Sequence, residues 1–166
     1  MKKVVSVLLV FAVLLALSSC ALIGKVYDKE AAEFSSNGLK ITLTEAFSET
    51  TVENYTVCFA SKSVLVLGLK EAFSIQEGLA DLTLNEYAAL VRQSNSTKSP
   101  TEISEENGLT SFEYSFLNTE ENKTYRYFTV MYKGSDAFWT VQLACEESAY
   151  EEHKPYMIEW AKSVSV

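Results

Sequence analysis

Few side chains in this sequence have the chemistry of a nucleophile, an acid–base catalyst or a metal ligand. The chain has three cysteines and a single histidine, His153. His153 follows Glu151 and Glu152 in a stretch typical of an exposed turn, and no serine or cysteine nucleophile motif accompanies it. We therefore expect a surface histidine, no catalytic residues and no enzyme activity. One histidine and no Cys-x-x-Cys pair also argue against zinc, and we expect neither metal nor cofactor.

The cysteine with the clearest chemical context is Cys20. It ends the run Leu17-Ser18-Ser19-Cys20, in which two small residues separate a leucine from a thiol. Small residues let an extended chain enter a peptidase cleft, and a thiol is a soft nucleophile that can accept a diacylglycerol. Lys2 and Lys3 precede an apolar segment from Val4 to Leu17. That segment is shorter than the roughly 20 residues that span a bilayer, which is typical of a secretory signal.

Residues 17 to 20 resemble the lipobox of bacterial lipoproteins. The resemblance implies that residues 1–19 are a lipoprotein signal peptide, that cleavage follows Ser19, and that Cys20 takes fatty-acyl chains of the palmitate kind. Two acyl chains hold a protein on a bilayer essentially permanently. We therefore expect a lipid-anchored protein on the extracytoplasmic face of the cell membrane. The alternative is an ordinary signal peptide with a chance cysteine.

The balance of charges restricts the partners. The chain has 14 Lys and Arg against 22 Asp and Glu, a formal net charge of −8, and loss of the signal segment would remove two of the lysines. Proteins that bind nucleic acid need Lys and Arg to replace phosphate counterions, so we expect no nucleic acid partner. An acidic surface also gives no electrostatic attraction to anionic lipid, so the acyl chains must provide the anchoring.

The two remaining cysteines, Cys58 and Cys145, allow two interpretations. In an oxidising compartment they could form a disulfide. Equally, both could be small buried core residues, as free cysteines often are. The sequence does not decide between these, because it does not give the separation of their Cα atoms.

The length after Ser19 corresponds to one domain, preceded by a linker. Residues 20–36 are expected to be the lipidated cysteine and a tether, because Ala21–Ser36 shows no sustained hydrophobic period. The alternative is that Tyr27–Phe34 docks as a short helix. The folded domain is expected over residues 37–166, beginning at the turn signal Asn37-Gly38.

Hydrophobic periodicity in this domain predicts about seven strands and two helices. Thr83 and Glu86 form a capping box at the start of a helix that ends near Ser94, and the main part of the last helix is expected from Pro155. Asn107-Gly108 predicts a hairpin turn. The predicted strands are 39–43, 55–60, 64–69, 103–106, 109–116, 124–132 and 137–145. This is an α+β fold, an antiparallel sheet with helices packed on both faces.

The order of these elements resembles the PsbP-like fold, which small bacterial lipoproteins of the DcrB type share. The residues that support the resemblance are Gly38–Leu43, Tyr125–Tyr132, Ala137–Leu143 and the closing segment Tyr150–Val164. Most of them are packing positions. The resemblance implies an α/β/α sandwich over about residues 38–164, and a non-enzymatic extracytoplasmic module that assists or docks onto larger assemblies.

A set of aromatic residues on the two longest predicted strands is the candidate binding face: Tyr125, Tyr127, Tyr132 and Trp139. If the sheet is not fully covered, these side chains would form an apolar patch for a partner or ligand. The alternative is that all of them are core. We expect a non-catalytic binding or assembly module for a cell-envelope protein. The alternative function is a small-ligand-binding lipoprotein that serves a transporter.

Overall fold

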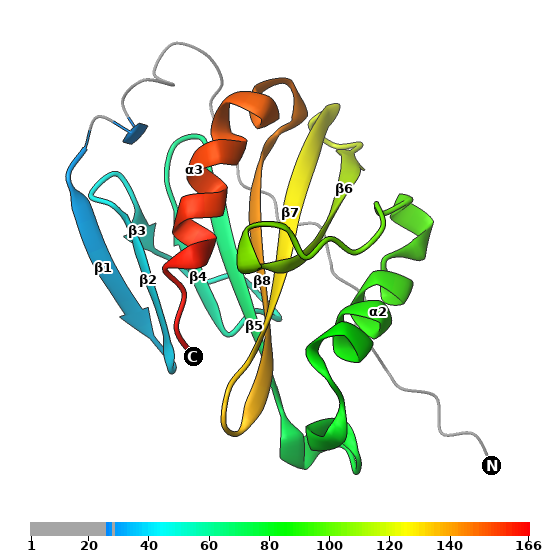
Figure 1. Ribbon diagram of the computed structural model, residues 1–166. Helices are drawn as coiled ribbons and strands as arrows, with labels where there is room; N and C mark the ends of the chain where they lie inside the picture. The colour runs from blue at the N-terminus through cyan, green and yellow to red at the C-terminus, as the bar shows by residue number, and fades with distance from the viewer. Residues whose placement is uncertain (1–25, 28) are drawn as a thin grey trace.

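The computed structural model describes residues 26–27 and 29–166. The predicted lipidation site Cys20 and the signal segment 1–19 lie outside the described residues. The strands of the described part are β1 Ala31–Ser36, β2 Leu39–Thr44, β3 Ser48–Glu49, β4 Val57–Ala60, β5 Leu65–Ala72, β6 Thr110–Asn118, β7 Lys123–Lys133 and β8 Ala137–Glu146. Its α-helices are α2 Leu84–Ser94 and α3 Tyr150–Lys162 (Figure 1). No helix in the described part of the chain is long and apolar enough to cross a bilayer.

The main sheet has six antiparallel strands in the order β3-β4-β5-β8-β7-β6. The predicted hairpin of the two long strands is confirmed as β7 and β8. Nearly every residue of β8 is buried, because β8 has strands on both sides and apolar or aromatic residues on both faces. Such a strand belongs at the centre of a sheet.

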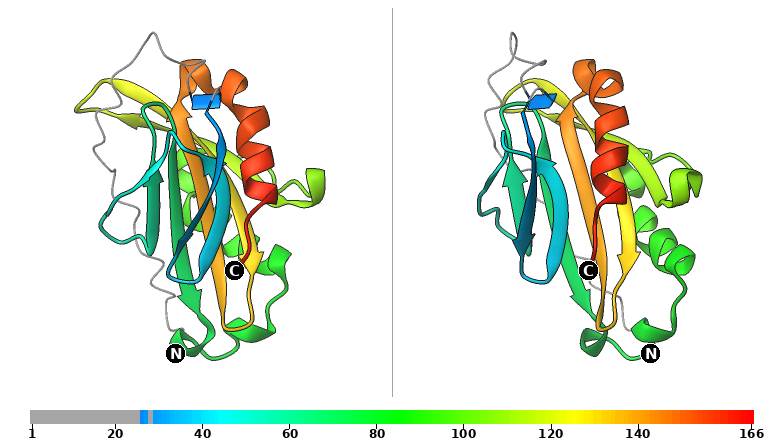
Figure 2. Two further views of the ribbon diagram at one scale, coloured as in Figure 1. Left: turned by 90° about the vertical axis from the view of Figure 1, so that its left-hand side faces the viewer. Right: turned by 60° about the vertical axis from the view of Figure 1, so that its left-hand side comes forward.

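The expectation of about seven strands is wrong in its count and in part of its assignment. Strands β1 and β2 form a separate two-stranded sheet that packs beside α3 over the main sheet (Figure 2). Residues 31–36, expected to be tether, are β1. This edge strand of small and charged residues alternates between exposed and half-buried positions, so its hydrophobic signal is weak. Phe34 anchors it against Phe59, with 5.3 Å between ring centroids.

Consecutive residues of β8 belong to different hydrophobic clusters, because side chains in a strand point alternately to opposite faces. Trp139 packs in a cluster with Met157 and Trp160 of α3 and with the apolar residues of β2. Its neighbour Phe138 packs with α2 instead, where Tyr87 stacks on it with 4.1 Å between ring centroids. The aromatic residues of the sheet therefore dock the helices.

The start of α2 agrees with the prediction. The Thr83 hydroxyl accepts a hydrogen bond from the Glu86 amide at 3.2 Å, and the Glu86 carboxylate accepts one from the Thr83 amide at 2.8 Å. This reciprocal pair satisfies two donors that the first turn would otherwise leave free.

Two other predictions are wrong: the start of the last helix and the hairpin at Asn107-Gly108. Helix α3 runs continuously from Tyr150 with Pro155 inside it, because Pro155 lies on the exposed side while Tyr150 and Met157 hold the buried side. Asn107 and Gly108 do adopt the positive φ of a turn, 59° and 73°. The segment before them, however, makes only a single bridge to β6 and no second hairpin strand.

Candidate functional site

The two cysteines are free buried thiols on opposite faces of the sheet. Cys58 packs with Leu67 and Ala144. Cys145 follows Ala144 in β8 and therefore points to the other face, into the cluster of Trp139. This placement rules out the disulfide and leaves the core interpretation. Burial raises the pKa of each thiol to about 12, so neither is a reactive thiolate near neutral pH.

The four aromatic residues of the predicted binding face do not share a face. Trp139 is 1% exposed, and Tyr132, its neighbour on β7, donates a hydrogen bond from its hydroxyl to the Ala161 carbonyl of α3 at 2.7 Å. Tyr125 and Tyr127 point to the other side of the sheet, where Tyr127 stacks on Tyr114 with 4.7 Å between centroids. The set therefore does not form one docking patch.

The prediction that His153 lies at the surface is wrong. Its side chain is completely buried on the inner side of α3, and neither ring nitrogen has a hydrogen-bond partner within the described residues. The Tyr27 ring lies 5.4 Å away, centroid to centroid. Burial lowers the pKa of His153, so the ring is neutral near pH 7. A histidine held in this way has no geometry for acid–base work on a bound molecule.

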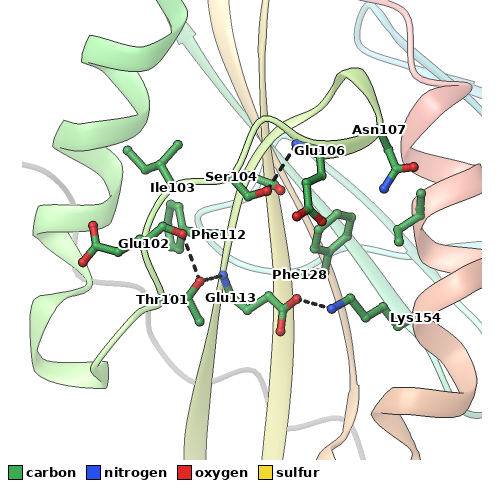
Figure 3. Close-up of a pocket in the computed structure, with 12 residues that line it drawn as sticks. Thr101, Glu102, Ile103, Ser104, Glu106, Asn107, Phe112, Glu113, Phe128 and Lys154 are labelled. Atoms are coloured by element: carbon green, nitrogen blue, oxygen red, sulfur yellow. Dashed lines mark hydrogen bonds and ion pairs between the residues drawn. The ribbon is translucent and has the colours of Figure 1, made fainter.

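A hollow of about 440 Å³ lies between the loop of residues 101–107, strands β6 and β7, and α3 (Figure 3). The loop is fastened to the outer edge of β6. The Thr101 amide donates to the Glu113 carbonyl at 2.8 Å, and its hydroxyl accepts from the Glu113 amide at 2.9 Å. Ser104 and Ser111 exchange two further backbone bonds. Edge strand β6 is thereby covered, and the loop forms a wall facing α3.

Glu113 provides the buried charge of this hollow, with a side chain only 12% exposed. Its Oε1 pairs with Lys154 Nζ at 2.8 Å, and its Oε2 with an Arg126 guanidinium nitrogen at 2.7 Å. Burial by itself would raise the pKa of Glu113, but the hydrogen bonds and charges of the two cations outweigh it and lower the pKa. Arg126 also lies over the Tyr150 ring, 4.8 Å from its centroid. These contacts fix one wall of the hollow.

Three polar side chains of the hollow can take further hydrogen-bond or charge partners. Ser111 is 5% exposed, yet its hydroxyl makes no hydrogen bond within the described residues. Glu106 forms no ion pair with any residue that the structure describes, and the Asn107 amide makes no side-chain hydrogen bond there. Figure 3 shows Glu106 and Asn107 on the loop side, across the hollow from Lys154 and Glu113. The apolar lining comes from Phe112, Phe128, Ile103 and Ile158.

The arrangement is suited to binding rather than to covalent chemistry. The lining contains no histidine and no cysteine, and the Ser111 hydroxyl has no base beside it among the described residues. A partly apolar hollow with a few unsatisfied polar groups can orient a bound group. Sequence reasoning missed this site. The available signal was Glu113, a charged residue between Phe112 and Tyr114 in a strand, which requires cationic partners when buried.

Among the solved structures that are similar to this chain is the solution structure of cyanobacterial PsbP (CyanoP) from Synechocystis sp. PCC 6803. The two structures superpose with a TM-score of 0.55 at 13% sequence identity, over 90% of this chain and 98% of that one. The chain has a PsbP-like fold. At this identity the likeness concerns the PsbP-like fold alone. No protein-family model matches the sequence, and no curated protein matches it.

Proposed function

We propose that the protein is an extracytoplasmic lipoprotein of the DcrB type, an α/β/α sandwich held on the cell membrane through lipid on Cys20. It acts as a non-catalytic binding or assembly module for a protein partner in the cell envelope. The motif Leu17–Cys20, after a short apolar segment, supports the anchor. The observation that supports binding is the hollow beside α3, with unsatisfied polar groups at its rim and floor.

The position of the hollow relative to the N-terminal segment favours this function. Tyr27 stacks on Tyr156 on one flank of α3, with 3.5 Å between ring centroids. Lys154 and Ile158 line the hollow from the opposite flank. A partner can therefore approach the hollow from the side of the domain that faces away from the docked N-terminal segment.

Lipid attachment is tested by growing cells with a clickable fatty acid. We expect the full-length protein to be labelled, Cys20→Ser to be unlabelled and Cys58→Ser to be labelled like the wild type. A labelled Cys20→Ser protein would contradict the anchor.

Partner binding is tested by placing a photo-crosslinking amino acid at Asn107, on the rim of the hollow, and at Glu77 as a matched exposed control. We expect one envelope protein to be crosslinked from position 107 and not from position 77. Crosslinks only between copies of the chain itself, or equal products from both positions, would contradict the proposal.

The second candidate function is a small-ligand carrier for a transporter. The size of the hollow favours it, because about 440 Å³ lies within the range of small-molecule sites. Native mass spectrometry of the purified protein is the test, and a bound mass retained by the wild type would support it.

A further inference from the structure

The charges and shape of the hollow beside α3 identify the kind of group that it takes. We propose that the hollow receives a lysine or arginine side chain of the protein partner. This inference rests on the proposed function and names the chemistry by which the partner is recognised.

Glu106 carries a charge that no described residue compensates. Glu102, also in the loop, is paired with Arg92 at 2.6 Å, whereas Glu106 forms no ion pair among the described residues. Its carboxylate stands on the loop wall of the hollow (Figure 3). A cation placed there would make a charge-assisted hydrogen bond with a carboxylate that no described residue neutralises.

The cations already near the hollow do not cancel this attraction. Lys154 and Arg126 are held by the two oxygens of Glu113, and the charge of Glu151 also acts on Arg126. Among the charged residues that line the hollow, Lys154 is the single base, against the acids Glu102, Glu106 and Glu113. The net charge of the whole chain, −8, favours the approach of a cation over that of an anion.

The floor of the hollow suits the rest of such a side chain. Lysine and arginine have apolar stems that lie along apolar surface while the charged head reaches a polar group. Phe128 is 5% exposed and Ile158 is half-buried, and both line the hollow. The Ser111 hydroxyl makes no hydrogen bond among the described residues and lines the hollow, so it can accept one from the bound head.

The test is an NMR titration of the purified full-length protein with acetyl-Gly-Arg-Gly-amide. The matched probe has citrulline in place of arginine, which keeps the shape and removes the charge. We expect the arginine peptide to shift the amide signals of residues 101–107, Ser111 and Ile158. The citrulline peptide should bind about two- to fivefold more weakly, because an ion pair with an exposed carboxylate is worth about that factor.

Substitutions then locate the site. Glu106→Gln should weaken binding of the arginine peptide about two- to fivefold, because Glu106 is exposed, whereas Glu120→Gln, an exposed carboxylate in the β6–β7 turn, should leave it unchanged. Both changes remove one negative charge, so a general charge effect would lower both affinities equally. Equal binding of the two peptides, equal effects of the two substitutions, or shifts confined to other regions would overturn the inference.

The same substitution separates this inference from the proposed function. If Glu106→Gln keeps the partner crosslink from position 107 at wild-type yield, the partner docks without this contact. The proposed function would then stand and the inference would fall. If the crosslink yield falls together with the peptide affinity, the inference is supported.

Discussion

His153 is a polar side chain in apolar surroundings. Two ring nitrogens that could hydrogen-bond are buried without partners among the described residues, next to Tyr27 and the apolar residues of the α3 interface. A buried polar atom without a partner costs about 1–3 kcal/mol. The ring therefore contributes its volume to the core while its nitrogens destabilise the folded state.

Replacing this ring tests that account. We expect His153→Leu, a substitution of similar volume, to leave the free energy of unfolding at pH 7.5 unchanged or to raise it by about 1 kcal/mol. Urea unfolding of the purified protein is the measurement, with Glu152→Gln on the exposed side of α3 as the control. A loss of more than about 2 kcal/mol would mean that the imidazole makes a contact that the leucine lacks.

His153 also makes the stability of the protein depend on pH. The unfolded chain has a histidine pKa near 6.5, and burial lowers the pKa in the folded state. Protonation thus favours the unfolded state, so the free energy of unfolding should fall as the pH drops below about 6.5. The same urea series between pH 7.5 and 5 should show a smaller decrease for His153→Leu. Equal decreases in both proteins would contradict the role of this residue.

Glu113 should stabilise the folded state, unlike His153, because both of its carboxylate oxygens have cationic partners. Replacing Glu113 by glutamine should leave Lys154 and Arg126 without a charged acceptor and lower the free energy of unfolding by about 1–2 kcal/mol. Glu102→Gln, at a 90% exposed side chain, should lower the free energy of unfolding by almost nothing.

The stabilisation by Glu113 should depend on pH. Because the folded pKa of Glu113 is lowered from 4.5, its contribution to the free energy of unfolding is present above about pH 4.5 and is lost as the pH falls further. Urea unfolding across this pH range is the measurement, and a pH-independent difference between the Glu113→Gln protein and the wild type would contradict this account.

These residues show what the sequence could and could not predict at this scale. The capping box of Thr83 and Glu86 follows from spacing along the chain, and it was predicted correctly. The burial of His153 depends on which side of α3 faces the sheet. The prediction of a main helix from Pro155 leaves His153 in a turn before it, so the helical periodicity was not applied to this residue. The partners of Glu113 come from β7 and α3, far apart in the sequence, so no local pattern reveals them.

At the scale of elements, the strands with a strong hydrophobic periodicity were predicted correctly, and a strand with a weak periodicity was missed. Strands β2, β7 and β8 have regular or continuous apolar patterns and were predicted within a residue or two. Strand β1 has one large apolar residue, Phe34, and is defined by its pairing with β2. Pairing with β2 stabilises the strand conformation of β1, and the local sequence pattern does not reveal this pairing.

Pro155 offers a test of how α3 is stabilised. Proline inside a helix lacks the amide that would bond to the carbonyl four residues earlier, and it costs about 3 kcal/mol in a regular helix. At this exposed position we expect Pro155→Ala to raise the free energy of unfolding by about 1–2 kcal/mol, since the alanine restores the bond but adds entropy to the unfolded chain. Thermal unfolding measures the change, with Glu159→Ala as an exposed control in the same helix. A lower melting temperature for Pro155→Ala would mean that the proline is needed where it stands.

At the scale of the whole molecule, the folded domain includes Val26 and Tyr27, although it was expected to begin at residue 37. Val26 is 3% exposed, and its carbonyl accepts a hydrogen bond from the Thr44 hydroxyl at 2.8 Å. Tyr27 stacks on Tyr156 and lies 5.9 Å from Trp160, centroid to centroid. These contacts connect the segment next to the proposed lipid anchor directly to α3.

Loss of the Tyr27 ring should therefore loosen the domain at its N-terminal end. We expect Tyr27→Ala to speed trypsin cleavage after the exposed Lys29 by about tenfold, because the lost ring packing is worth about 1–2 kcal/mol of local stability. Limited digestion of the full-length protein bound to liposomes, followed by mass spectrometry, measures the rate of cleavage.

Tyr27→Phe is the matched control. The Tyr27 hydroxyl is buried without a hydrogen bond among the described residues, so its removal should leave cleavage as slow as in the wild type or slower. If both substitutions speed cleavage equally, the hydroxyl rather than the stacked ring holds the segment. If neither does, β1 and its pairing with β2 protect Lys29 without help from α3.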